Sequence, residues 1–367
     1  MLTLGFMTLH LNNEHGYFTE IAKRSIHHEI TCYRFVPSNF NPHSETIDGE
    51  EFDNIQNDWI PKTFPLPDLL YDRCFYGEDF HSRQCKAIVD WLKAKEMAHF
   101  LGFGLPNKLD LYRVLSQSKV SPYLPITVPV NSSEMMKSLL EKMKRLIIKP
   151  INGSQGIGIY LIEKEGEQIL VRTDKKEQQV TRTFTDDNHF FKWVKRILNK
   201  REFLLQPYLP LVNDLNQPYD IRSLLQKHNQ GKWKVVGKGV RQGAPGGIIS
   251  NLSAGAEVID FSTWLKTINY QKRAFILEEI NDILNSLPII LEEHFPPLFE
   301  LGVDIGIAKD GSIWILDINS KPGRKVLLRL HPELADDLYE SPLIYAYTLK
   351  ERGYLLHEKT LSNRNQP

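Results

Sequence analysis

Apolar and polar positions along this chain follow two different periods. Short runs of alternating residues predict strands, and longer stretches with an apolar residue every third or fourth position predict amphipathic helices. In the N-terminal hundred residues these two patterns alternate, which is typical of a small α/β unit. The expected strands are residues 2–8, 30–36 and 69–75, and the expected helices are residues 17–28 and 80–95. Residues 37–67 are rich in Asn, Asp and Pro, so we expect mostly loop there, with room for an edge hairpin around residues 45–52.

Beyond residue 100 the predicted strands are more frequent. Asn107 suits the N-cap of a helix over residues 107–115. Further helices are expected at residues 132–144, 186–200, 270–294 and 332–352. Strands are expected at residues 125–130, 146–150, 159–162, 168–173, 178–184, 203–209, 219–226 and 233–241.

The pattern that follows the long predicted helix is the most informative in the chain. Alternating apolar residues predict two strands, and Asp310-Gly311 is a strong signal for a tight turn between them. In such a pair Asp304 and Asp317 lie at the same open end, and Asn319 points to the same face as Asp317. Two carboxylates and an amide carbonyl are hard oxygen ligands of the kind that Mg²⁺ prefers. The alternative is a hairpin with solvated polar ends, but Asp317 directly follows an apolar run, where a carboxylate needs a partner.

A second informative pattern is a strand that ends at Lys149, followed by a glycine-rich loop and another strand. Glycine lets backbone N–H groups turn toward phosphate oxygens, and Lys149 adds a positive charge for the same phosphates. The loop is not a Walker A motif, which leads into a helix, nor a dinucleotide fingerprint, because a strand follows it. A tight turn that binds nothing is the alternative. The loop residues are Gly153, Ser154, Gln155, Gly156 and Gly158.

Two further predicted strands carry charged residues. The alternation after Tyr219 puts Asp220 and Arg222 on one face of a strand. The next strand ends at Arg241 and leads into a long glycine-rich loop, residues 242–255. We expect that loop to lie near the same end of the sheet.

The composition is that of an ordinary globular protein, with 41% hydrophobic and 25% charged residues. The 45 Lys and Arg balance the 45 Asp and Glu, so no net field favours nucleic acid or an anionic membrane. No apolar run approaches the length of a membrane span, and no signal peptide is expected. The three cysteines are too few for a disulfide framework or a zinc site. Asp72, Arg73 and Glu78 follow a predicted strand and are expected to be solvated, with the lining of a pocket as the alternative.

These patterns occur in a fixed order: a strand with Lys149 and a glycine loop, a hinge strand, an Asp-x-Arg strand, a strand ending at Arg241, and a hairpin with Asp304, Asp317 and Asn319. In this order they resemble the ATP-grasp superfamily, especially glutathione synthetase, the ribosomal-protein glutamate ligase RimK and D-alanine–D-alanine ligase. The whole chain resembles the YheC/YheD group of spore-forming bacilli, named for association with the endospore coat. The resemblance implies an α/β (α+β) ATP-grasp fold preceded by a small α/β domain.

The resemblance also implies a division of the chain. Residues 1–100 would form the N-terminal domain, and residues 101–355 the ATP-grasp domain. Within the latter, the expected parts are a linker (101–145), a lid subdomain with the glycine loop (146–209) and a metal-binding subdomain (210–355). Residues 356–367 are polar and expected to form a flexible tail.

Carried over position by position, the resemblance implies a role for each candidate residue. It implies that Lys108 and Lys149 contact the ATP phosphates, that Gln206 and Leu209 contact the adenine, and that Arg222 and Arg241 bind the γ-phosphate and an acyl phosphate. The flap over the β- and γ-phosphates would consist of Gly153, Ser154, Gln155, Gly156 and Gly158, and one or two Mg²⁺ ions, with Mn²⁺ as a substitute, would be bound by Asp304, Asp317 and Asn319.

Two positions depart from the family pattern. Related ligases usually carry Glu at the position of Asp317, and the shorter Asp would bridge two metal ions poorly, so a one-metal or weakened site is expected. Gln206 also stands where Glu is frequent, but it keeps its hydrogen-bonding capacity. Both changes are compatible with nucleotide binding.

The implied activity is ATP- and Mg²⁺-dependent ligation of a carboxylate to an amine through an acyl phosphate, with ADP as a product. The substrate, a small molecule or a peptide, is not identified. Two alternatives stay open: a nucleotide-binding, spore-coat-associated structural protein without turnover, and an ATP-grasp phosphotransferase. The implied partners are ATP, the substrates and spore coat proteins, with neither nucleic acid nor membrane, and the implied location is the cytoplasm or the spore.

Overall fold

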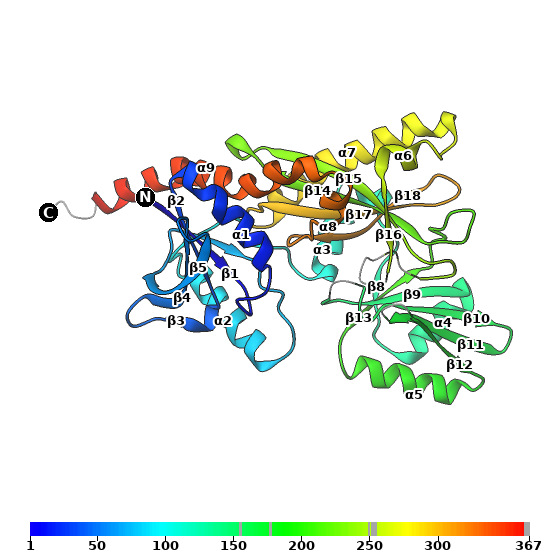
Figure 1. Ribbon diagram of the computed structural model, residues 1–367. Helices are drawn as coiled ribbons and strands as arrows, with labels where there is room; N and C mark the ends of the chain where they lie inside the picture. Colours follow the sequence, from blue (N-terminus) through cyan, green and yellow to red (C-terminus); the bar gives the residue numbers. More distant parts are fainter. Residues whose placement is uncertain (154–155, 176–177, 249, 251–254, 363–367) are drawn as a thin grey trace.

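Three β-sheets follow one another along the chain. The computed structural model describes residues 1–153, 156–175, 178–248, 250 and 255–362. In Figure 1 the N-terminal sheet (blue) lies to one side of the C-terminal sheet, and a third sheet (green) lies below the latter. The three sheets therefore form separate layers rather than one continuous sheet.

The N-terminal sheet has a parallel centre. Its strands are β1 (Leu2–Met7), β2 (Ile30–Phe35), β3 (Phe40–Asn41), β4 (Thr46–Asp53), β5 (Asp58–Pro65), β6 (Leu69–Asp72) and β7 (His99–Phe100). They are ordered β3-β4-β2-β1-β6-β7, with β5 on β4, and β1 runs parallel to both β2 and β6. Helices α1 (His15–Arg24) and α9 (Ala335–Ser362) pack on one face and α2 (Phe80–Ala94) on the other, each through its own apolar cluster. The predicted strand–helix alternation is confirmed.

The prediction of mostly loop between β2 and β6 is wrong. Strands β4 and β5 form a hairpin in which all eight residues of each strand are paired. The cross-strand pair Phe52 and Trp59 is buried, which gives the hairpin an apolar face on the sheet. Pro61 is compatible with this pairing because, in the described chain, β5 pairs only with β4 and leaves its other edge free.

The middle sheet is antiparallel and has both of its helices on one face. Its strands are β8 (Val128–Pro129), β9 (Arg145–Pro150), β10 (Tyr160–Glu165), β11 (Gln168–Lys175), β12 (Gln178–Phe184) and β13 (Phe203–Pro207). They are ordered β12-β11-β10-β9-β13-β8. Helices α4 (Ser133–Met143) and α5 (Asp187–Leu198) share a buried cluster with Ile148 and its neighbours. Lys149, the next residue, therefore points to the opposite face.

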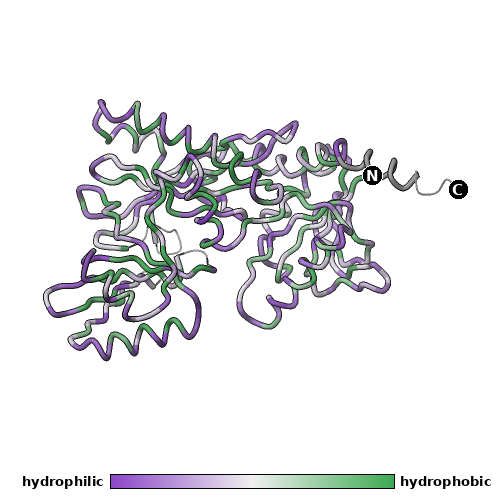
Figure 2. Tube along the Cα trace, turned by 180° about the vertical axis from the view of Figure 1, so that it is seen from behind, coloured by the Kyte–Doolittle hydropathy of each residue, from purple (hydrophilic) through white to green (hydrophobic). Residues whose placement is uncertain are grey.

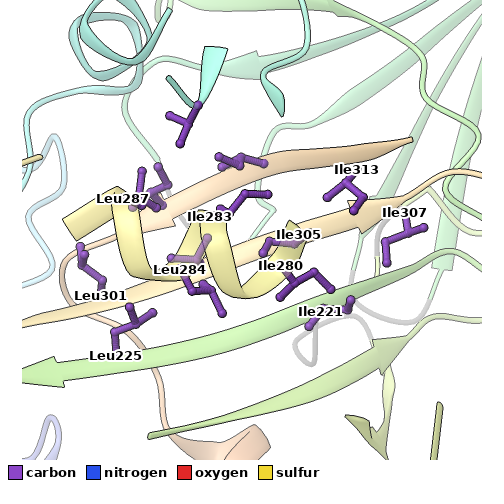
Figure 3. Close-up of a cluster of buried hydrophobic side chains, with 14 of the residues drawn as sticks. Ile221, Leu225, Ile280, Ile283, Leu284, Leu287, Leu301, Ile305, Ile307 and Ile313 are labelled. Carbon is purple, nitrogen blue, oxygen red and sulfur yellow. The ribbon is translucent and has the colours of Figure 1, made fainter. Parts of the chain in front are cut away.

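The C-terminal sheet has one apolar face and one charged face. Its strands are β14 (Tyr219–Lys227), β15 (Trp233–Gln242), β16 (Glu257–Asp260), β17 (Glu300–Ile307) and β18 (Ile313–Asn319), ordered β16-β15-β14-β17-β18. Helix α7 (Tyr270–His294) covers the apolar face together with α3 (Lys108–Leu115) and α6 (Phe261–Leu265). Figure 3 shows Ile283 and Leu284 of α7 among the side chains of Ile305 and Leu301 on β17.

The last two α-helices of the described chain pack against different sheets, one against the C-terminal sheet and the other against the N-terminal sheet. Helix α8 (Lys325–Leu330) packs beside β15, and α9 places Leu343 and Tyr345 in the core of the N-terminal sheet. The backbone of α9 continues to Ser362, into the segment expected to be a flexible tail. Figure 2 shows apolar residues along the strands and hydrophilic residues on the outer turns of the helices. Among the described residues, no helix combines the length and apolar character needed to cross a membrane.

Candidate functional site

A β-bulge in the C-terminal hairpin brings two acidic residues face to face. Ile305 of β17 pairs with Ile315 of β18, but Asp304, the residue before Ile305, pairs with Asp317 and not with Leu316. Leu316 is therefore an extra residue on β18, opposite no single partner. Regular pairing outward from the Asp310-Gly311 turn predicts that Asp304 lies opposite Asp317. The two residues are paired in the structure, but the bulge, and not regular pairing, brings them opposite each other.

The bulge also decides which side chains enter the core. Ile315 and Ile318 both belong to the apolar cluster under α7. Asp317, between Leu316 and Ile318, points to the opposite face, and Asn319 follows it there. Nδ2 of Asn319 lies 3.3 Å from Oδ2 of Asp317. The charged face thus gains a carboxylate and an amide at the end of β18.

Ion pairs continue across this face on β14, β15 and β17. Arg222 is the cross-strand neighbour of Asp304, with Nε 2.5 Å from Oδ1 and Nη2 2.9 Å from Oδ2. Arg241 is the neighbour of Asp220 and donates two hydrogen bonds of 2.6 Å to its carboxylate. Nη2 of Arg241 also lies 2.9 Å from Oδ2 of Asp304. One carboxylate, that of Asp304, is therefore shared by two guanidinium groups.

Gly302 leaves the space that Arg222 needs. It lies two residues before Asp304 and on the same face. A Cβ at this position would lie 2.9 Å from Nη1 of Arg222 and 2.8 Å from Cβ of Pro322. The absence of a side chain lets the guanidinium and the segment after β18 approach the strand together.

Two lysines reach this face from other elements. Lys108 is the first residue of α3, and the predicted N-cap Asn107 accepts two hydrogen bonds of 3.0 Å from that first turn. Nζ of Lys108 lies 2.7 Å from Oδ1 of Asp317. Lys149, on β9, donates a 3.1 Å hydrogen bond to the backbone carbonyl of Leu316, the bulge residue. The middle sheet therefore contacts the C-terminal sheet at the bulge itself.

The environment shifts the ionisation of several of these groups. Burial, together with the nearby Lys108 ammonium, lowers the pKa of Lys149 to about 8. Burial alone would raise the pKa of Asp317, but Lys108 and Lys149 hold it below its usual value. Burial and the charge of Asp304 raise the pKa of Asp220 despite its contact with Arg241. The face is a tightly coupled set of opposite charges.

The glycine loop between β9 and β10 has the backbone that glycine permits. Gly156 and Gly158 have φ of 74° and 82°, in the left-handed region that other residues rarely adopt. Gly153 has φ of 155°. Ser154 and Gln155, the two remaining candidates in this loop, lie outside the described residues.

The two candidates for an adenine contact lie apart from the charged face. Nε2 of Gln206, on β13, donates a 2.7 Å hydrogen bond to Oγ1 of Thr127. Leu209 lies two residues beyond β13, and its carbonyl accepts a hydrogen bond from Leu211. Among the described residues, neither Gln206 nor Leu209 hydrogen-bonds to a member of the ion pairs on the charged face. Both remain candidates by resemblance.

Sequence reasoning placed Asp220 on the face of Arg222 but gave it no role. In the structure Asp220 holds Arg241, and Oγ of Ser250 donates a 2.5 Å hydrogen bond to its Oδ2. The alternation along β14 was the available signal for Asp220. Nothing in the sequence pattern identified Ser250, which lies in the long glycine-rich loop after β15.

The prediction that Asp72 and Arg73 are solvated is wrong. Both are buried, whereas Glu78 is exposed. Nη1 of Arg73 lies 2.7 Å from Oε1 of Glu300, and Arg324 binds the other oxygen of Glu300 at 2.5 Å. These side chains join the N-terminal sheet to β17 and to the segment after β18, so their charges have buried partners.

Asp304, Asp317 and Asn319 fit a divalent cation by their chemistry. They place two carboxylates and one amide on one face, and Mg²⁺ takes such oxygens when phosphate oxygens complete its coordination. Oδ1 of Asp304 is buried and accepts no hydrogen bond from the described residues, although Nε of Arg222 lies nearby. A carboxylate oxygen in that position is suited to be a ligand atom. In the described part of the chain, no cluster of three or more His, Cys, Asp or Glu side chains is arranged to hold a metal.

Comparison with known proteins decides the family. The model of the YheC/D-like ATP-grasp family matches residues 97–349. The chain is 40% identical over 361 residues to the endospore coat-associated protein YheC of Bacillus subtilis (strain 168), covering 98% of both chains. The chain belongs to the YheC/D-like ATP-grasp family. Membership of an ATP-grasp family implies binding of ATP, and the α/β ATP-grasp fold predicted from the sequence is confirmed.

Solved structures agree on the fold of this YheC/D-like chain. The D-Ala:D-Ser ligase VanG of Enterococcus faecalis superposes with a TM-score of 0.55 at 9% identity, over 94% of this chain and 99% of that one. The D-alanine–D-alanine ligase of Coxiella burnetii superposes with a TM-score of 0.53 at 12% identity, over 99% of both chains. At such identities the likeness concerns the fold alone.

Proposed function

We propose that this YheC/D-like protein is an ATP- and Mg²⁺-dependent ligase that joins a carboxylate to an amine through an acyl phosphate. The observation that supports this is the charged face of the C-terminal sheet. Three cationic side chains, from β14, β15 and α3, contact two carboxylates from β17 and β18 there, and Lys149 of β9 binds the backbone carbonyl of Leu316 between them. The structurally similar D-alanine–D-alanine and D-Ala:D-Ser ligases make such a reaction class a natural candidate.

In this proposal the cations bind phosphoryl groups. Lys108 and Lys149 contact the ATP phosphates, and Arg222 and Arg241 hold the transferred phosphoryl oxygens, because guanidinium groups bind such oxygens through paired hydrogen bonds. Mg²⁺, held by Asp304 and its neighbours on β18, neutralises phosphate charge when bound. The two arginines are fixed by carboxylates, so they are oriented before any phosphate arrives.

The chemistry itself needs no covalent nucleophile from the protein. A carboxylate oxygen of the substrate forms a bond to the γ-phosphorus while the bond from that phosphorus to ADP breaks. The amine nitrogen then attacks the acyl carbon, and inorganic phosphate leaves with the electron pair of the carbon–oxygen bond. The amine loses a proton in this step. We assign the adenine contact to Gln206 and Leu209, and the closing flap to the glycine loop.

The proposed domains divide this work. Residues 1–100 contact the substrate side through the segment after β18, residues 146–209 form the lid, and residues 210–355 carry the metal. Residues 101–145 link the first two parts and supply Lys108. From the name of the relative YheC we also propose where the protein is found: it is a cytoplasmic protein that associates with the spore coat and its proteins.

The proposal is tested by thermal unfolding with and without ATP and Mg²⁺, followed by an assay of ADP release with a panel of acids and amines. Ligand at 100 times its Kd stabilises the folded protein by about 2.7 kcal/mol. We expect such stabilisation in the wild type, its reduction in Asp317→Ala, and no reduction in Asp310→Ala, where the carboxylate lies in the exposed turn. No stabilisation by ATP in the wild type would contradict the proposal.

A second function is favoured by Asp317, which is shorter than the usual Glu, and by the name of the relative YheC. It is a nucleotide-binding structural protein of the spore coat without turnover. Stabilisation by ATP without ADP release from any acid and amine would support it. Release of ADP with a stable phosphorylated acid, and no amide, would instead identify a phosphotransferase.

A further inference from the structure

A groove lies on the middle sheet, on the side away from the charged face. It runs between β12 and α5, has a volume of about 460 Å³, and is lined by Arg182, Thr183, Phe184, Lys192, Trp193 and Arg196. Helix α5 packs on the face of the sheet that holds Ile148, whereas Lys149 points to the opposite face and contacts Leu316. Figure 1 shows α5 on the outer side of its sheet, away from β14 and β17. The groove is therefore separate from the proposed ATP site.

The floor of the groove is aromatic and firmly packed. The ring of Trp193 lies 5.9 Å from that of Phe184, 6.0 Å from that of Phe190 and 5.4 Å from that of Tyr160. Rings at these separations fix one another in position. Trp193 and Phe184 remain only half-buried, so an apolar face is open at the bottom of the groove.

The walls carry positive charge without counter-ions. Arg182, Lys192 and Arg196 form no ion pair with any of the described residues, whereas Asp187 at the start of α5 is paired with Lys137. Arg182 is the cross-strand partner of Val171, which belongs to the core under α5. The side chain of Arg182 therefore lies on the face of the sheet that α5 covers, not on the opposite face. Three cations are thus directed into one concavity, although the charges of the whole chain balance.

We propose that this groove is a docking site for an acidic, extended segment of a protein partner. The carboxylates of such a segment would pair with the three cations, and one apolar side chain would rest on Trp193. In the described chain β12 pairs only with β11, so its outer edge is open to an extended peptide. Three cations are fewer than the roughly 6–10 phosphate contacts of a nucleic-acid site. They are also fewer than the about 4–8 basic residues of a membrane-binding cluster.

The test is fluorescence anisotropy of a labelled, glutamate-rich peptide with one central Phe, titrated with the full-length protein. We expect binding that weakens with salt, and a loss of affinity of about tenfold or more in the double variant Lys192→Glu and Arg196→Glu. The matched control is Lys195→Glu, which makes the same kind of charge change on the same helix outside the groove. It should retain most of the affinity. Trp193→Leu should weaken binding without changing the charge.

Three outcomes would overturn the proposal. The first is no binding by the wild type, in which case Arg182 only protects a free strand edge from pairing. The second is an equal loss in Lys195→Glu, which would indicate general electrostatic attraction. The third is stronger binding of phosphatidylglycerol vesicles or of an oligonucleotide at the same residues. Because surface variants of α5 leave the charged face intact, stabilisation by ATP serves as a check that each variant is folded.

Discussion

Gly302 illustrates how closely side chains are packed on the charged face. The guanidinium of Arg222 and the ring of Pro322 both occupy the volume in which a side chain at this position would lie. Arg222 cannot retreat without losing its two contacts with Asp304. The ion pair and the backbone of β17 are therefore fitted to each other at the level of single atoms.

We expect Gly302→Ala to destabilise the protein by about 1–3 kcal/mol, because overpacking of a fitted site forces neighbouring atoms to move. The measurement is urea unfolding. Gly16→Ala is the matched control, since nothing lies within 4 Å of a Cβ at Gly16 in α1. It should be neutral or stabilising by up to about 1 kcal/mol. Equal stability of the two variants would show that Arg222 and Pro322 adjust freely.

At the scale of elements, the charged face depends on where helices and strands begin. Helix α3 starts at Lys108 because Asn107 caps its first turn, and this start directs Lys108 toward Asp317. A helix that began one turn later would leave Lys108 on a mobile segment. The N-cap is therefore a positioning contact for a residue of the proposed site.

Asn107→Ala should lower the unfolding free energy by about 1 kcal/mol, the usual effect of losing an N-cap. Asn107→Ser keeps an acceptor oxygen and adds no charge beside Asp110, whose Oδ2 accepts a 2.8 Å hydrogen bond from Nδ2 of Asn107, so it should retain most of the stability of the wild type. The unfolding free energies of both variants are measured in urea, and the ATP-dependent thermal shift is measured alongside. A stable Asn107→Ala protein with an unchanged shift would show that the cap does not position Lys108.

Elements with strong local patterns were predictable. Helix α7 was predicted with its observed ends, and the β17–β18 hairpin follows from its alternation and its Asp310-Gly311 turn. The β4–β5 hairpin was largely missed, because charged residues and Pro61 hide its apolar pairs. The partners of the buried charges depend on strand order, which sequence does not reveal. Arg73 and Glu300, for example, are 227 residues apart in the chain.

At the scale of the whole molecule, buried charges hold the N-terminal sheet against the segment that follows β18. Oδ1 of Asp72, at the end of β6, accepts a 2.8 Å hydrogen bond from Nζ of Lys321, and Nζ of Lys93 lies 3.7 Å from Oδ2 of Asp72. Burial alone would raise the pKa of Asp72, but Lys321 and Lys93 outweigh it and hold the pKa below its usual value of 3.8. Because Lys321 follows the proposed metal ligands closely, this contact couples the N-terminal domain to the site.

The sign of the pH dependence follows from that lowered pKa. The contribution of Asp72 is fully present above its unfolded pKa of 3.8 and is lost as the pH falls through the lower, folded value. Asp72→Asn should therefore cost about 3 kcal/mol at neutral pH, as expected for breaking a buried ion pair. The difference from the wild type should shrink below about pH 4.

Urea unfolding across that pH range measures the difference between the two proteins. The control is Asp90→Asn, which removes an exposed carboxylate paired with Lys86 on α2 and should change stability much less. A difference for Asp72→Asn that stays constant down to low pH would show that the pKa of Asp72 is the same in the folded and unfolded states, and not lowered by folding.

The bulge at Leu316 makes the site sensitive to the length of the chain as well as to its composition. Odd-numbered residues of β18 face the core before the bulge and the charged face after it. Regular pairing through Leu316, without the bulge, would give a single parity along the strand and would turn Asp317 and Asn319 toward the hydrocarbon under α7. A chain with one residue fewer at this point would instead pair regularly with Asp317 still opposite Asp304, so homologues that keep this site are expected to have either the bulge or a hairpin one residue shorter.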